Sequence, residues 1–149
     1  MTVSMKTLNA YIATMLWSSM VMLPAGEDEL VDGCMDVPED HHLHGVSEHD
    51  NMDDHYDADD LTLAARYRAR VDLQNFFNAV DDNDLHEAAN ETHDDESIAH
   101  DFWLTRNGHG AGFWDGDYND DIGERLTQLA ESFGECNVCV NNDGHVEIL

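Results

Sequence analysis

The chain has 149 residues, a length that fits a single domain over residues 1–149. Its 33 acidic residues face six lysines and arginines, so the formal net charge at pH 7 is −27. This charge repels nucleic acid and anionic lipid, and we expect no direct binding to nucleic acid or membrane. No apolar run reaches the roughly 20 residues of a membrane span, and the interrupted run near the N-terminus lacks a clear signal-peptide cleavage site.

The first expected element is a helix over residues 7–21, because apolar side chains recur there at helical spacing behind a possible Thr7 N-cap. Residues 26–60 follow, with fourteen acids, five histidines and no lysine or arginine. They contain too few apolar residues for a core of their own. We therefore expect a long acidic, histidine-rich loop or insertion.

A second helix is expected to begin at Asp59 or Asp60 and to end near Val80, because its alanine, leucine and phenylalanine side chains share one broad face. A short helical piece is expected around residues 84–90. The acids that precede and follow the second helix are candidates for a charged surface.

The segment HDFWLTRNGHGAGFWDGD, residues 100–117, has two aromatic runs on either side of a glycine-rich connection. Asn107 and Gly108 favour the positive φ angles of a tight turn. Aromatic strands around such a turn predict a β-hairpin. We expect Trp103 and Trp114 to be buried against the first two helices.

An apolar stripe from Ile122 to Phe133 predicts a third long helix, with Asp121 and Glu124 as a capping box and Gly134 after its end.

The last segment, NVCVNNDGHVEIL, alternates β-branched residues around an Asn-Asn-Asp-Gly turn and predicts a second β-hairpin. The order of elements predicts an α+β fold with a small antiparallel sheet of two hairpins packed with about three helices. Residues 100–149 would form its hairpin–helix–hairpin core.

HDFWLTRNGHGAGFWD, residues 100–115, resembles the core of a small, mostly uncharacterised family of bacteriophage and prophage proteins. LNAYIATMLWSS, residues 8–19, is similar to that family's first helix, and GERLTQLAESFG and NNDGHVEIL match it more loosely. The acidic segment at 26–60 departs from the pattern, because it is longer and more charged than the family's linker. The resemblance implies a viral or prophage origin and a host-cytoplasmic location, and it implies no particular activity.

One cluster in the expected hairpin could serve a small enzyme, with a histidine as general base and an arginine as anion ligand. Its members are His100, Asp101, Arg106, Asn107 and His109. No nucleophile or phosphate-loop motif accompanies them. Since polar groups at a tight turn usually fix that turn, we predict a structural role and no catalytic residue.

Each potential metal site in the sequence lacks part of its ligand set. Asp115, Asp117 and Asn119 alternate as in a calcium loop, but the loop's glycine and bidentate glutamate are replaced by Asp120 and Leu126. The single Cys-x-x-Cys pair has no second pair to complete a zinc site. The histidines of the acidic segment are irregularly spaced. The cysteines of the pair are Cys136 and Cys139, and the histidines are His41, His42, His44, His49 and His55. We predict no metal or cofactor.

Two explanations compete for the acidity. Duplex DNA carries one negative charge per ~1.7 Å of axis, so 27 charges match ~46 Å of duplex, close to the ~38 Å width of a domain of this length. A DNA mimic could therefore occupy the basic DNA-binding groove of a host defence or DNA-processing protein. Adaptation to high salt also favours aspartate and removes lysine, and the charge then serves only solubility.

Charge clustering favours mimicry, because 23 of the 33 acids lie in residues 26–60 and 81–101. We predict a non-enzymatic viral interaction protein that mimics DNA. The alternatives are a salt-adapted accessory or structural protein, and a small enzyme or metal-binding protein that uses residues 100–109. The predicted DNA-like surface consists of Asp53, Asp54, Asp57, Asp59, Asp60, Asp81, Asp82 and Asp84.

Overall fold

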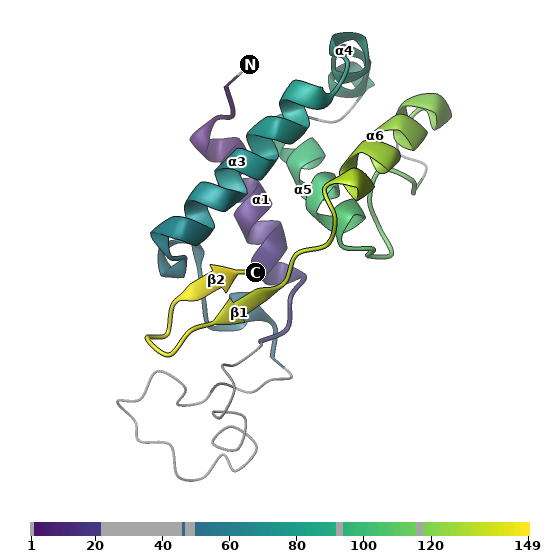
Figure 1. Ribbon diagram of the computed structural model, residues 1–149. Coiled ribbons are helices and arrows are strands. Elements are labelled where there is room, and N and C mark those ends of the chain that lie inside the picture. Colours follow the sequence, from purple (N-terminus) through teal and green to yellow (C-terminus); the bar gives the residue numbers. More distant parts are fainter. Residues whose placement is uncertain (1, 22–45, 47–49, 92–93, 116–117) are drawn as a thin grey trace.

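The computed structural model describes residues 2–21, 46, 50–91, 94–115 and 118–149 (Figure 1). They form an α+β fold, as predicted, but a mostly helical one. The elements are α1 (Met5–Trp17), the 3₁₀ helices η1 (Met52–Asp54) and η2 (Ala58–Asp60), α3 (Leu63–Ala79), α4 (Asp82–Glu91), α5 (Asp95–Arg106), α6 (Asp120–Ser132), β1 (Val138–Val140) and β2 (Val146–Ile148). Within these ranges, no helix is long and apolar enough to cross a membrane.

The helix α1 lies at the centre of the packing, in contact with both α3 and α5, and α5 in turn packs against α6. Figure 1 shows α4 at one end of this arrangement and the β1–β2 hairpin at the other. The predicted first helix is confirmed, but its N-cap is Ser4. The Ser4 hydroxyl oxygen accepts a hydrogen bond of 3.0 Å from the backbone N–H of Thr7, the residue expected to be the cap.

The second predicted helix is confirmed as α3, and its N-cap is Thr62, not Asp59 or Asp60. The two aspartates are part of η2 instead. There Asp57 and Asp60 form a capping box. The Asp57 carboxylate accepts a hydrogen bond from the Asp59 N–H at 2.9 Å, and the Asp60 carboxylate accepts one from the Asp57 N–H at 2.8 Å. The extra 3₁₀ turn moves the start of α3 a few residues along the chain.

Four aromatic rings from four segments form a continuous stack in the core. Tyr11 of α1 stacks on Phe102 of α5 with ring centroids 5.5 Å apart, Phe102 stacks on Phe76 of α3 at 4.1 Å, and Phe76 stacks on Phe113 at 5.7 Å. Each of these residues is at most 1% exposed. Aromatic pairs of this kind contribute roughly 0.5–1.5 kcal/mol beyond area burial. The stack fixes α1, α3, α5 and the turn after α5 relative to one another.

The predicted hairpin over residues 100–117 is wrong. Asp95–Arg106 form the helix α5, and a glycine-rich turn follows it. The helix begins at Asp94, whose carboxylate accepts from the Ser97 N–H at 2.9 Å. Its last five residues, 102–106, are all at most 4% exposed. Burial on every side leaves neither a helical stripe nor a strand alternation in the sequence, so the β preference of the aromatic residues misled the prediction.

Asn107 and Gly108 end α5 and do not turn a hairpin. Gly108 has φ of +70°, and its N–H donates to the Thr105 carbonyl at 3.2 Å. The next N–H, that of His109, donates to the Leu104 carbonyl at 3.0 Å. These two bonds form a Schellman motif. A helix end and a hairpin turn both need positive φ, so the Asn-Gly dipeptide fits either.

The second predicted hairpin is confirmed. β1 pairs antiparallel with β2, with Val138 opposite Ile148 and Val140 opposite Val146. Leu61 forms a parallel bridge to Val146, which attaches the hairpin to the chain just before α3.

The third long helix is confirmed as α6, and Gly134 follows it with φ of +74° as predicted. The cap differs. Asn119 accepts from the Asp121 N–H at 3.1 Å, in place of the predicted capping box of Asp121 and Glu124.

Most of the predicted acidic loop, residues 26–45 and 47–49, lies outside the described residues. Its last part, residues 50–60, forms η1 and η2. An isolated antiparallel bridge joins Asn51 to Met20, so this part is attached to the chain after α1.

Candidate functional site

The arginine of the HDFWLTRNG segment has a structural role. Arg106 is 4% exposed, and its Nη1 donates to the Asp72 carboxylate at 2.9 Å and to the Tyr11 hydroxyl at 3.1 Å. Its Nε and Nη2 donate to the carbonyl oxygens of Gly134 at 2.9 Å and Phe133 at 3.1 Å. Burial raises the pKa of the Tyr11 hydroxyl, which therefore stays protonated. This one side chain links α1, α3, α5 and the end of α6.

The glycines after α5 allow the turn to pack directly against two helices. The Phe113 N–H donates to the Thr105 hydroxyl at 3.1 Å. A Cβ at Gly112, whose φ is +148°, would lie 2.2 Å from that hydroxyl oxygen. A Cβ at Gly123 of α6 would lie 2.7 Å from the Phe113 carbonyl oxygen. Both distances are too short for nonbonded atoms, so both positions need glycine and the turn packs closely against α5 and α6.

The five enzyme-like residues do not converge on one site. His100 Nδ1 lies 2.7 Å from the Thr14 hydroxyl of α1, and the Asp101 carboxylate accepts from the Tyr118 hydroxyl at 2.7 Å. Both line a hollow beside α1, whereas Asn107 and His109 line a different one near β1. Arg106 lies in the core. The side chains of His100, Asp101, Arg106 and Asn107 each form a hydrogen bond within the fold, and the five residues do not line one common hollow.

Among the residues that the structure describes, no group of three or more histidine, cysteine or acidic side chains could hold a metal ion. Asp117 of the calcium-like loop and four of the acidic segment's histidines, His41, His42, His44 and His49, lie outside that part of the chain. Cys136 and Cys139 are free thiols, and burial raises the pKa of both. Raised thiol pKa values make metal binding and nucleophilic attack less favourable.

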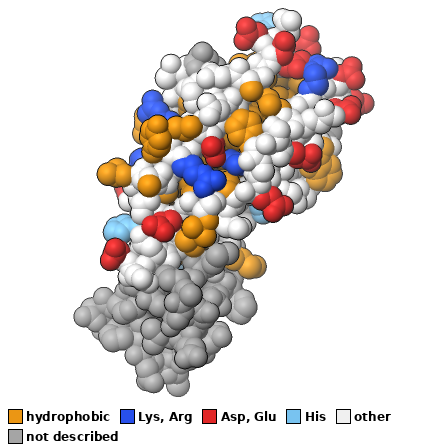
Figure 2. Space-filling view, in the orientation of Figure 1, with side chains coloured by type: hydrophobic (Ala, Val, Ile, Leu, Met, Phe, Trp, Pro, Cys, Tyr) orange, Lys and Arg blue, Asp and Glu red, His pale blue; other side chains and the backbone are white. Residues whose placement is uncertain are grey.

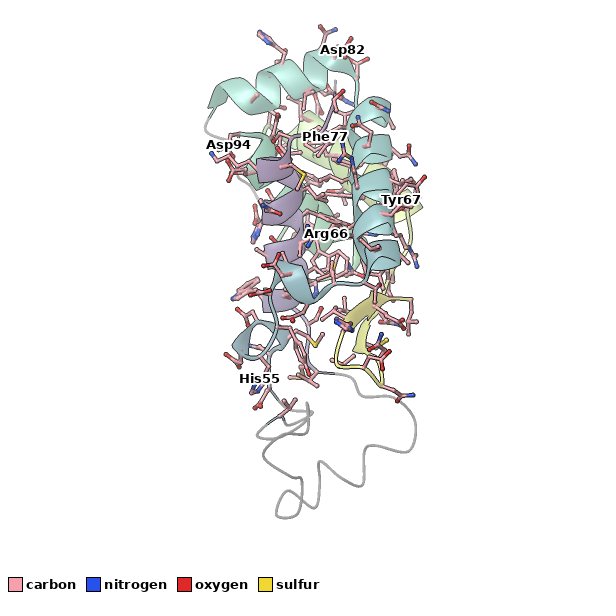
Figure 3. The ribbon with its side chains drawn as sticks, turned by 90° about the vertical axis from the view of Figure 1, so that its left-hand side faces the viewer. His55, Arg66, Tyr67, Phe77, Asp82 and Asp94 are labelled. Atoms are coloured by element: carbon pink, nitrogen blue, oxygen red, sulfur yellow. The ribbon has the colours of Figure 1, made fainter. Side chains whose placement is uncertain are left out.

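The predicted acidic surface falls into two groups at opposite ends of α3. Asp53, Asp54, Asp57, Asp59 and Asp60 come before this helix, and Asp81, Asp82 and Asp84 come after it. The helix has 17 residues and is therefore ~25 Å long. In Figure 3, His55 marks one end and Asp82 the other, with Arg66 and Tyr67 of α3 between them. The acids do not form one unbroken row.

Six of these eight acids are exposed, Asp60 is half-buried, and Asp84 is only 9% exposed. The Asp84 carboxylate accepts two hydrogen bonds from Arg125 of α6, at 2.6 and 2.7 Å. This bidentate pairing lowers the pKa of Asp84. Asp84 therefore joins α4 to α6 and is not part of the solvated surface that the sequence predicted.

Most of the few cations of the chain have partners within the molecule, although only Arg106 is buried. Lys6 pairs with Glu96 at 2.5 Å, Arg106 with Asp72 at 2.9 Å and Arg125 with Asp84 at 2.6 Å. Arg66 donates to a carbonyl of η2, and Arg68 lies 3.9 Å from Asp72 on its own helix. Arg70 is exposed on α3. The exposed carboxylates thus keep most of their charge, and Figure 2 shows acidic side chains gathered where α4 and α6 lie.

A hollow of about 350 Å³ lies between the glycine-rich turn and α6, and we call it the Trp114 hollow. It is lined by aromatic side chains and carboxylates. These are Phe113, Trp114, Tyr118, Asp120 and Glu124, with Thr127 beside them. Trp114 is 56% exposed, whereas Trp103 is 1% exposed. The prediction that both tryptophans are buried is confirmed for Trp103 and wrong for Trp114.

This hollow was not among the sites predicted from the sequence, although one spacing of acidic residues is compatible with it. Asp120 and Glu124 are four residues apart, so they share a face of α6. In the predicted hairpin over residues 100–117, Trp114 lies in the core. Asp120 and Glu124 then have no exposed aromatic neighbour, and their spacing alone does not indicate a binding site.

Comparison of the chain with protein-family models, curated proteins and solved structures finds no match.

Proposed function

We propose that this chain is a non-enzymatic interaction protein that occupies the basic DNA-binding groove of a host protein, in a viral or prophage setting. Binding is electrostatic and steric, without turnover. The acids that face the partner are the exposed members of the two groups that flank α3. Asp84 is left out, because it is paired with Arg125.

The observation that carries this proposal is that Arg106 is buried and that Lys6, Arg66, Arg68 and Arg125 are each held by a partner within the fold. The chain has 33 acids, and the negative electrostatic field of its surface would be weakened if free lysines and arginines were interspersed with them. Here the partners of these cations are carboxylates or a carbonyl. The exposed carboxylates therefore attract a basic partner and raise its association rate.

The spacing of the two groups supports DNA mimicry. They are ~25 Å apart along α3, which is about seven base pairs at 3.4 Å per step on each strand. A groove that contacts phosphates over that length could contact both ends of α3 at once. Three arginines of α3 lie between the groups, and their charges oppose such a contact. Arg70 is exposed, and the side chains of Arg66 and Arg68 are 31% and 42% exposed.

A second candidate is a salt-adapted protein whose charge serves solubility. It is favoured by the acids outside the two groups, because Asp120, Asp121, Glu124 and Glu131 of α6 are also exposed. An acidic coat over many elements is what high salt selects, whereas mimicry requires only the contact surface to be acidic.

A competition experiment separates the two candidates. A labelled duplex of ~13 base pairs is bound to host-defence and DNA-processing proteins, and this protein is added while fluorescence anisotropy is recorded. The proposal expects displacement of the duplex that weakens steeply as salt is raised. Melting curves at low and multimolar salt are recorded in parallel. A chain that folds only in multimolar salt and never displaces DNA would contradict mimicry and support salt adaptation.

A further inference from the structure

We propose that the Trp114 hollow binds the guanidinium group of an arginine side chain on the basic partner. This inference rests on the proposed function, because a groove that binds DNA presents arginines. It assigns a specific contact to a surface otherwise described only by its charge.

The exposure of Trp114 is the first argument. Trp103 and Trp114 belong to the same short segment, yet Trp103 is 1% exposed and its indole N–H donates to Ser18 at 2.8 Å. Trp114 is 56% exposed. A large aromatic side chain beside a hollow, with most of its surface outside the core, is typical of the residues that dominate binding energies at interfaces.

The rigidity of the turn is the second argument. Phe113 is fixed by its hydrogen bond to Thr105 and by its place in the aromatic stack. The turn lies directly against α5 and α6, since a Cβ at Gly112 would overlap Thr105 and a Cβ at Gly123 would overlap the Phe113 carbonyl. Trp114 follows Phe113 directly, so its backbone is held before any ligand arrives. A prearranged aromatic group loses little conformational entropy on binding.

The composition of the hollow selects a cation. Aromatic faces attract cations, and arginine stacks on them with its flat guanidinium. Asp120 and Glu124 supply carboxylates on the α6 side of the same hollow. Glu124 accepts a long hydrogen bond, 3.4 Å, from Gln128. Thr127 also lines the hollow, and its hydroxyl oxygen is buried and has no hydrogen-bond partner within the described ranges.

The protein already contains one arginine in such surroundings. The Arg106 guanidinium lies 5.3 Å from the centre of the Phe102 ring and 5.8 Å from that of Phe133, and it pairs with the Asp72 carboxylate. Two rings and a carboxylate surround this cation in the core, together with the Tyr11 hydroxyl and two carbonyl oxygens. The Trp114 hollow repeats the aromatic rings and the carboxylates at the surface. Arg125 follows Glu124 in the sequence, but its guanidinium is paired with Asp84 and is not the cation of this hollow.

The size of the hollow agrees with a single side chain. Its volume of about 350 Å³ is at the small end of the range for ligand pockets, roughly 300–1,000 Å³. It is open to solvent, so a side chain on a partner's surface can enter it.

The test uses the full chain and a small probe, L-argininamide, with neutral citrullinamide as the matched control. The three tryptophan indole N–H signals are followed by ¹H–¹⁵N NMR and assigned with Trp17→Phe and Trp114→Phe variants. Trp17 is a suitable internal control, because it is 54% exposed but lies on α1, outside the hollow. We expect argininamide to shift the Trp114 signal saturably, with Kd on the order of millimolar, and to leave Trp17 unshifted.

Two charge variants sharpen the test. Glu124→Gln should weaken argininamide binding about fivefold, whereas Glu131→Gln, on the same helix but away from the hollow, should change it less than about twofold. Three results would overturn the inference: equal shifts of Trp17 and Trp114, equal binding of argininamide and citrullinamide, or equal effects of the two variants.

This titration needs no partner protein, so its outcome is independent of the competition with DNA. Saturable argininamide binding without displacement of DNA would leave the hollow assigned and remove the proposed function. Displacement of DNA without argininamide binding would retain the proposed function and remove the hollow from it.

Discussion

Arg106 Nη1 lies 2.9 Å from the Asp72 carboxylate, with the arginine side chain almost completely buried. The pair joins α5 to α3, and the same guanidinium also donates to two carbonyl oxygens after α6. Removing the arginine would leave a carboxylate and these carbonyls without their donor, which is why such pairs are costly to break.

Arg106→Met should therefore destabilise the fold by roughly 3–5 kcal/mol. Arg70→Met, which removes the same charge from an exposed position on α3, should change the free energy of unfolding by less than about 0.5 kcal/mol. Denaturant titrations followed by circular dichroism measure both. Similar stabilities for the two variants would show that Arg106 does not hold the helices together.

The two tryptophans of the glycine-rich segment should respond differently to truncation. Trp103→Ala removes a fully buried side chain and should cost roughly 3–5 kcal/mol. Trp114→Ala should cost less than about 1 kcal/mol, because more than half of that side chain is in contact with solvent. Equal losses in thermal melts would mean that Trp114 is part of the core and that its hollow does not exist.

Gly112→Ala tests the packing of the turn on α5. The new Cβ would lie 2.2 Å from the Thr105 hydroxyl oxygen at a φ of +148°, so both strain and overlap oppose it. We expect a loss of roughly 1–3 kcal/mol. Gly110→Ala is the matched control, since a Cβ there meets nothing within 4 Å. If the two substitutions have the same effect in denaturant titrations, the turn does not pack as described.

The Asp84–Arg125 pair predicts a particular dependence of stability on pH. Arg125 lowers the pKa of Asp84 in the folded state, so protonation favours the unfolded chain. The stabilisation is present above the unfolded carboxyl pKa of about 3.9 and is lost as pH falls through the lower folded value. The difference in Tm between wild type and Asp84→Asn should thus be constant above about pH 5 and shrink below about pH 4.

Comparing these two proteins cancels the effect of the other acids, whose mutual repulsion also changes with pH. A difference in Tm that stays constant down to pH 2 would show that the pair does not stabilise the fold.

The sequence predicted the elements whose pattern is local. The amphipathic stripes of α3 and α6 and the Asn-Asn-Asp-Gly turn each leave a periodic or turn pattern that requires no knowledge of the neighbours. The helix α5 leaves no such pattern, because residues 102–106 are enclosed on all sides. Its aromatic residues and Asn-Gly end were compatible with a hairpin, and only the tertiary contacts of Arg106 and Phe102 decide for a helix.

The candidate site was predictable in its chemistry but not in its arrangement. The acids before and after α3 were identified as a surface from their clustering. Composition does not determine that the length of α3 separates them. It also does not determine that Asp84 pairs with Arg125, which depends on how α4 packs near α6. The Trp114 hollow depended on the fold of the preceding helix and was missed with it.

The most direct test of the central claim compares two charge-matched variants in the DNA competition assay. One carries Asp53→Asn, Asp54→Asn and Asp82→Asn, which remove three exposed acids at the ends of α3. The other carries Glu131→Gln, Glu135→Gln and Asp143→Asn, which remove three exposed acids elsewhere. We predict that the first weakens competition about tenfold and the second less than about twofold, with unchanged melting of both. Equal weakening by the two variants would show that total charge and not its placement governs binding, which would contradict the proposed DNA-like surface.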